Sequence, residues 1–141
     1  MTRDLGAVVV DTGVFAANLQ EVTTDLVELY EMDTKRKRLL ISFQTAAEIR
    51  YGAANASWGR RRIAEMEQRL AVAVTVPPAD ALVREWANLR VECQRVGHSF
   101  HEKVHVADLR IAATATLLDL RLVTHDAGFR GVPGLEVICH V

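Results

Sequence analysis

"VVVDTG", residues 8–13, joins a continuous run of β-branched residues to an aspartate. A short apolar run without alternation is typical of a strand buried on both faces, as in a parallel sheet. We therefore expect a strand over 7–10 that ends at Asp11. The role of Asp11 stays open at this point. It fits the catalytic turn of an aspartic protease, the nucleophile loop of a phosphatase, a metal ligand at a strand end, or the cap of the next helix.

Helical and strand patterns alternate along the rest of the chain. Apolar periodicity predicts helices over 22–32, from Ser42 or Thr45 to about Gly52, and over 60–70, 80–96 and 104–118, with a short helical turn at 126–130. Strands are expected at 39–41, 72–76, 120–124 and 135–139. This alternation predicts an α/β fold with a mostly parallel central sheet. The length of 141 residues, without repeats or a linker, predicts one domain over 1–141.

The composition places limits on partners and compartment. Seventeen basic and eighteen acidic residues leave a net charge of −1, so nucleic acid could be held only by local patches. Cys93 and Cys139 lie far apart and are expected to be free thiols of a reducing cytosol. The apolar run over 7–10 is too short for a secretory signal or a membrane span. We expect a cytoplasmic protein without a membrane segment.

Four acidic residues lie next to strand ends or helix starts of the predicted fold. Asp11 follows the first strand, and Asp126 follows the strand over 120–124. Glu48 and Asp108 lie early in helices that begin near the carboxyl ends of the strands. Because α/β folds place their sites at this edge, we expect the four carboxylates to come together there.

Four converging carboxylates cannot all stay ionised unless a cation binds, and otherwise some of them must bind protons. Two of them about 4 Å apart repel by about 4 kcal/mol at an effective dielectric near 20. Oxygen-only ligands suit a hard ion such as Mg²⁺ or Mn²⁺, which stabilises phosphoryl oxygens and activates water. Each acid also has a purely structural interpretation. Asp11 and Asp126 could cap the following helical turns, Thr45 and Glu48 could form a capping box, and Asp108 could favour the helix dipole. Independent caps, however, need not gather at one edge.

The motifs in their order resemble the PIN-domain family, and specifically VapC-type toxin ribonucleases of bacterial toxin–antitoxin systems. The resemblance rests on "VVVDTGVF", "ISFQTAAEIRYGA", "HVADLRIAATA" and "LVTHDAGFRGVPGLEVI", and it covers nearly the whole chain. It implies a three-layer α/β/α domain and hydrolysis of RNA phosphodiester bonds by a metal-activated water. It also implies that the four acids bind Mg²⁺ or Mn²⁺, while Thr12 and Thr124 orient carboxylates or waters.

The same resemblance implies a VapB-like antitoxin as partner, a toxin homodimer and a toxin–antitoxin hetero-oligomer. Two positions depart from the usual pattern: His125 stands where Arg or Asn is frequent, and Ala107 stands where a polar residue often precedes the third acid. Either could alter contacts with the substrate. The alternative function is a PIN-like module that binds RNA or a partner without cutting.

The aspartic protease and phosphatase interpretations of Asp11 each require a further acidic residue or motif that the chain lacks. An aspartic protease is essentially all-β and needs a second Asp-Thr-Gly, which the chain does not contain. The phosphatase loop needs an acid two residues after the first, where this chain has Gly13.

Other polar groups are less informative. His98, His101 and His105 could suggest zinc, but a zinc site would need a fourth ligand that we cannot name, and we favour contacts with solvent or RNA. The basic clusters at 35–38 and 60–62 could contact RNA phosphates or serve solubility alone. Arg50 and Arg110 each lie two residues after a site acid, an offset that turns them away from the ligand face of the helix.

Overall fold

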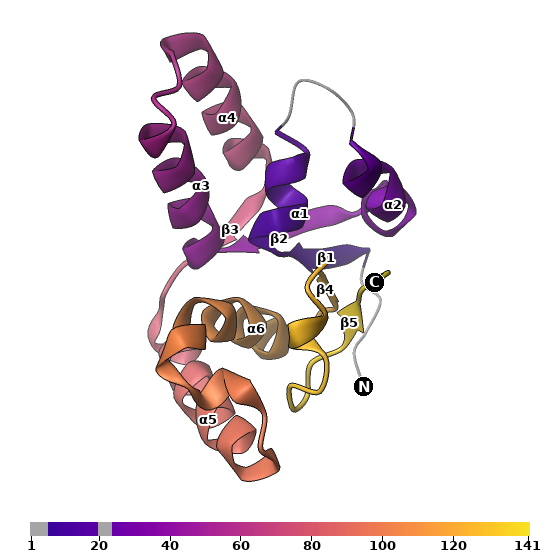
Figure 1. Ribbon diagram of the computed structural model, residues 1–141, viewed down its shortest axis with the longest axis vertical. Helices are drawn as coiled ribbons and strands as arrows, with labels where there is room; N and C mark the ends of the chain where they lie inside the picture. Colours follow the sequence, from indigo (N-terminus) through magenta and orange to yellow (C-terminus); the bar gives the residue numbers. More distant parts are fainter. Residues whose placement is uncertain (1–5, 20–23) are drawn as a thin grey trace.

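A computed structural model, which describes residues 6–19 and 24–141, contains a five-stranded sheet in the order β3-β2-β1-β4-β5 (Figure 1). Every neighbouring pair of strands is parallel. The strands are β1 (Ala7–Val10), β2 (Arg38–Ser42), β3 (Val74–Val76), β4 (Leu122–Val123) and β5 (Val137–Ile138). The expected α/β class with a parallel sheet is confirmed.

Helices cover both faces of the sheet and give the molecule three layers (Figure 1). One layer consists of α1 (Thr12–Ala17), α2 (Asp25–Thr34), α3 (Phe43–Asn55) and α4 (Arg60–Val72). The opposite layer consists of α5 (Asp80–Val96) and α6 (Val106–Leu118). The described residues also contain three single turns of 3₁₀ helix: η1 (Ser99–His101), η2 (Lys103–His105) and η3 (Ala127–Phe129).

The valines of β1 explain why both faces are covered. Val8 and Val10 belong to the core under α1–α4, whereas Val9 belongs to the core under α5 and α6. None of the three is more than 1% exposed. Successive side chains of a strand point to opposite faces, so an uninterrupted apolar run requires a hydrophobic layer on each side.

The strand order places Asp11 at the centre of the sheet. The chain runs outward from β1 through β2 to β3, and then returns to build β4 and β5 on the other side of β1. The amide of Asp11 donates to the carbonyl of Val123 at 3.0 Å, so Asp11 ends β1 while still paired with β4. Open parallel sheets form their binding crevices where the strand order reverses in this way.

Several boundaries differ from those expected. The strands predicted at 120–124 and 135–139 pair over only two residues each, and the strand predicted at 39–41 extends by one residue at each end as β2. The helix predicted from 104 begins at Val106, after the separate turn η2. The helix predicted from 22 begins at Asp25, and its first two predicted residues lie outside the described part of the chain. Gly97 ends α5 with φ 75°, as expected for a glycine at that position.

Within residues 6–19 and 24–141, no helix is long and apolar enough to cross a lipid bilayer. Both cysteines are free: Cys93 is buried and Cys139 is half-buried.

Candidate active site at the carboxyl edge of the sheet

The four acids line one cavity of about 320 Å³ at the carboxyl end of β1. They arrive from four different elements, namely the end of β1, the second turn of α3, the first turn of α6 and the cap of η3. The cavity lining consists of Asp11, Thr12, Gly13, Glu48, Asp108, Ile111, Asp126 and Phe129. The topology thus brings together acids that are up to 115 positions apart in the sequence.

Asp11 is the most buried of the four, with 7% of its surface exposed. One carboxylate oxygen accepts a hydrogen bond from the Val14 amide at 2.9 Å and caps α1, and the other accepts from the Thr124 hydroxyl. Burial raises the pKa of Asp11, the two hydrogen bonds lower it, and the charges of Asp126 and Asp108 raise it again. The pKa remains above its ordinary value of 3.8. Asp11 therefore caps a helix and also faces the cavity.

Thr124 connects two of the acids. Its fully buried hydroxyl donates to Asp11 and accepts from the backbone amide of Asp126 at 3.0 Å. Asp126 in turn caps η3 by accepting from the Gly128 amide at 2.8 Å. Because a hydroxyl donates once and can accept twice, one side chain fixes both the Asp11 carboxylate and the backbone that carries Asp126.

Glu48 is held by Thr12 and does not form the expected capping box. The Thr12 hydroxyl donates to Glu48 Oε1 at 2.6 Å and lies 3.0 Å from the Thr45 hydroxyl. The cap of α3 is Ser42, whose hydroxyl accepts from the Gln44 amide at 3.1 Å. The helix therefore begins one turn earlier than a Thr45 cap requires, and Thr45 is fully buried inside it. The capping-box interpretation of Thr45 and Glu48 is wrong.

Asp108 is paired with a histidine. His105 Nδ1 lies 3.2 Å from Asp108 Oδ2, and about a third of each side chain is exposed. Burial raises the pKa of Asp108, the hydrogen bond from His105 lowers it, and the charges of Asp126 and Glu48 raise it. The net shift is upward from 3.8. The carboxylates thus perturb one another across the cavity.

These observations fit a divalent cation. The donor set is made of carboxylate oxygens, which Mg²⁺ and Mn²⁺ prefer, and burial, with a smaller contribution from the neighbouring acids, keeps the pKa values of Asp11 and Asp108 high. Each carboxylate already has a hydrogen-bond donor that orients it. Among the described residues, no three His, Cys, Asp or Glu side chains are grouped closely enough to hold one ion as they stand. The fit therefore rests on donor chemistry and on charge.

The arginines beside the acids point to other partners. Arg50 forms a bidentate ion pair with Glu67 of α4 at 2.8 and 3.0 Å, and Arg110 donates to Gln44 Oε1 at 3.0 Å.

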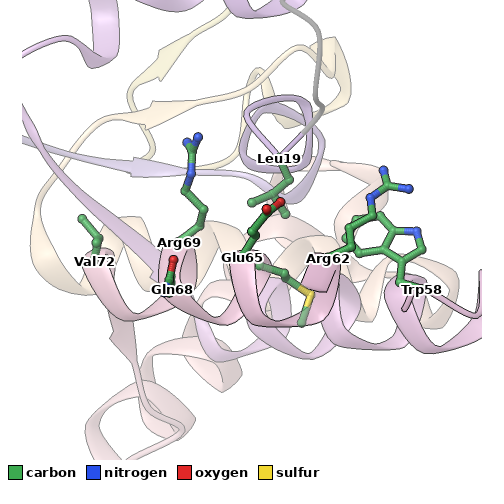
Figure 2. A pocket seen from close by; sticks show the side chains of 8 residues that line it. Leu19, Trp58, Arg62, Glu65, Gln68, Arg69 and Val72 are labelled. Carbon is green, nitrogen blue, oxygen red and sulfur yellow. The ribbon is translucent and has the colours of Figure 1, made fainter. Parts of the chain in front are cut away.

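The basic cluster at 60–62 lies on α4, where the guanidinium carbon of Arg62 lies 3.7 Å from the centre of the Trp58 ring. Figure 2 shows Arg62 against Trp58 in a hollow along α4 that Glu65 also lines. This hollow shares no lining residue with the acidic cavity.

Two of the three histidines have structural partners. His98 Nδ1 accepts from the Phe100 amide at 3.1 Å, so its proton lies on Nε2 and is donated to the Arg130 carbonyl at 3.0 Å. His101 Nδ1 donates to the His98 carbonyl at 2.7 Å. Only His105 contacts a site acid within the described residues. The contact between His105 and Asp108 was not predicted, although residues three positions apart on a helix are neighbours on its surface.

The sequence was compared with models of known protein families. The sequence model of the PIN domain matches residues 8–135. The chain belongs to the PIN-domain family. Ribonuclease VapC5 of Mycobacterium tuberculosis is 33% identical to this PIN domain over 137 residues, which cover 95% of this chain and 93% of that protein. The predicted family is confirmed.

Solved structures agree with this assignment. The VapBC-5 complex of Mycobacterium tuberculosis, a member of the VapBC family of toxin–antitoxin systems, contains a chain that superposes with a TM-score of 0.62 at 30% identity. The alignment covers 95% of this chain and 98% of that one. DNA-bound VapBC2 of Rickettsia felis gives a TM-score of 0.76 at 19% identity, covering 94% and 98% of the two chains. The second likeness concerns the fold alone.

Proposed function

We propose that this PIN-domain protein is a metal-dependent endoribonuclease toxin that hydrolyses RNA phosphodiester bonds. One observation carries the proposal: the four acids line a single cavity in a chain 33% identical to a ribonuclease. Carboxylates gathered at a parallel-sheet edge suit phosphodiester chemistry, in which charge develops on phosphoryl oxygens. We take residues 1–141 as one PIN-like domain.

The cation would be held by Asp11, Glu48, Asp108 and Asp126. When bound, Mg²⁺ or Mn²⁺ supplies positive charge for the phosphoryl oxygens and lowers the pKa of a water molecule. The threonines position the ligands: Thr12 holds Glu48, and Thr124 holds Asp11. The raised pKa of Asp108 also suits a carboxylate that takes a proton from the attacking water.

The relatives suggest how the activity is controlled. The chains with which this protein superposes come from VapBC complexes, so we propose a VapB-like antitoxin as partner, together with a toxin homodimer and a toxin–antitoxin hetero-oligomer. An RNA substrate and two free thiols both fit the cytoplasm.

An RNA-cleavage assay with a matched pair of variants tests the activity. Purified protein freed of any antitoxin is given RNA with Mg²⁺ or Mn²⁺, beside Asp11→Asn and Asp119→Asn. Asparagine at 11 can still cap α1 through its oxygen, so the fold is kept while the charge is lost. Asp119 ends α6 at φ 54°, a conformation that asparagine tolerates. Wild type and Asp119→Asn should cleave, and Asp11→Asn should not.

Two results would count against the proposal. Equal cleavage by wild type and Asp11→Asn would remove Asp11 from the site. Binding of RNA without cleavage by any form would favour the alternative, a PIN-like module that binds without cutting. Expression of the wild-type chain alone should also arrest bacterial growth, and Asp11→Asn should not.

A further inference from the structure

The histidine beside Asp108 is held in place by aromatic packing. The ring of His105 stacks on Phe100 with centroids 5.1 Å apart and an interplanar angle of 28°. Phe100 is 2% exposed and meets Phe129 edge to face at 5.0 Å. Phe129 lines the acidic cavity, in the turn η3 that Asp126 caps. One buried ring therefore supports both the neighbour of Asp108 and the turn that follows Asp126.

The hydrogen bond fixes which ring nitrogen of His105 carries a proton. An ionised carboxylate can only accept, so the 3.2 Å contact requires a proton on Nδ1 that is donated to Asp108 Oδ2. This hydrogen bond restricts the rotation of the Asp108 carboxylate. His105 is the cap residue of α6, three residues before Asp108, so its stacked ring lies beside the carboxylate that the first turn of the helix carries.

From this geometry we infer that His105 is a positioning residue, which orients the Asp108 carboxylate for binding a divalent cation. The inference rests on the proposed function, because it requires the acidic cavity to bind the ion. Donors that orient a ligating carboxylate commonly change metal affinity by about 10- to 100-fold when removed. His98 and His101, which bond backbone carbonyls, have no such role.

Binding of Mn²⁺ to the full chain, measured by calorimetry without RNA, tests the inference. His105→Phe keeps a ring to stack on Phe100 but removes the donor, and should weaken binding by about 10- to 100-fold. His105→Asn places an amide N–H near the position of Nδ1, and should recover most of the affinity. His101→Phe alters the same loop away from the acids, and should bind Mn²⁺ like the wild type.

The outcomes separate the two proposals. If the wild type binds no Mn²⁺, the metal site of the proposed function fails and this inference falls with it. If the wild type binds and His105→Phe binds equally well, only the role of His105 is refuted. The same conclusion follows if His105→Asn binds as weakly as His105→Phe, since a restored N–H donor would then recover no affinity. Should His105→Phe fail to fold, as judged by thermal melting, His105→Leu takes its place in the comparison.

Discussion

Replacing Thr124 with valine removes one hydroxyl and leaves the shape of the side chain almost unchanged. Thr124 is fully buried, and its hydroxyl both donates to Asp11 and accepts from the Asp126 amide. Valine can make neither hydrogen bond. The substitution therefore isolates the polar link between two site acids, without the cavity that a truncation would create.

The expected loss follows from the two hydrogen bonds. A bond to a charged acceptor contributes about 1.5–3 kcal/mol, and one between neutral groups about 0.5–1.5 kcal/mol. Thr124→Val should therefore lower the free energy of unfolding by about 2–4.5 kcal/mol in metal-free protein at pH 7. The hydroxyl lowers the pKa of Asp11, which means that it favours the ionised form. The loss should accordingly shrink as the pH falls through the raised pKa of Asp11.

Urea unfolding, with the free energy taken from midpoint and slope, measures this loss. Thr124→Ser is the matched control: it keeps the hydroxyl, loses one methyl group, and should cost about 0.5–1.5 kcal/mol, as Ile→Val does in a core. A loss below about 1 kcal/mol for valine would refute the proposed link, given these hydrogen-bond magnitudes. Serine as destabilising as valine would refute it too, since the methyl group would then be responsible.

Three further predictions concern charge and hydrogen bonding. The pKa values of Asp11 and Asp108 are higher in the folded protein than the ordinary value of 3.8. Just above pH 3.8 the folded state therefore binds more protons than the unfolded state, and the contribution of these two carboxyls to stability falls as the pH rises. Metal-free Asp108→Asn should therefore gain stability relative to the wild type as the pH of the thermal melts is raised above about 4. Arg50→Ala should cleave RNA like the wild type and change the free energy of unfolding by less than about 1 kcal/mol, because its ion pair with Glu67 is exposed. Tyr30→Phe should destabilise by about 1–3 kcal/mol in urea, because the buried hydroxyl accepts from the His140 amide and donates to the Thr124 carbonyl.

The valine run was enough to predict a parallel strand buried on both faces, and the positions of the acids at the ends of strands and the starts of helices were enough to predict their convergence. An uninterrupted apolar strand requires helices on both sides, and parallel strands bring their carboxyl ends to one edge. The first inference depends on a local apolar pattern, and the second on a general rule for parallel sheets. The structure accordingly has Asp11 at the end of the central strand, facing the same cavity as the other acids.

The partners of each carboxylate could not be predicted in this way. Thr12 reaches Glu48 across 36 positions, and Thr124 reaches Asp11 across 113, so both contacts depend on how the layers pack. The capping box at Thr45 failed because Ser42, three residues earlier, offers a cap at the end of β2. The two-residue strands β4 and β5 were overpredicted because apolar residues beyond the ladder pack into the core without pairing.

A titration with Mn²⁺ tests most directly whether the distant acids form one site. Wild-type protein, Asp108→Asn and Asp119→Asn are compared in metal-free buffer at neutral pH. Asp108 and Asp119 lie at opposite ends of α6, so the pair differs in position and not in the charge removed. We expect the wild type and Asp119→Asn to bind Mn²⁺, and Asp108→Asn to lose this binding. Binding that survives in Asp108→Asn, or that is lost equally in both variants, would contradict a metal site built from the four acids.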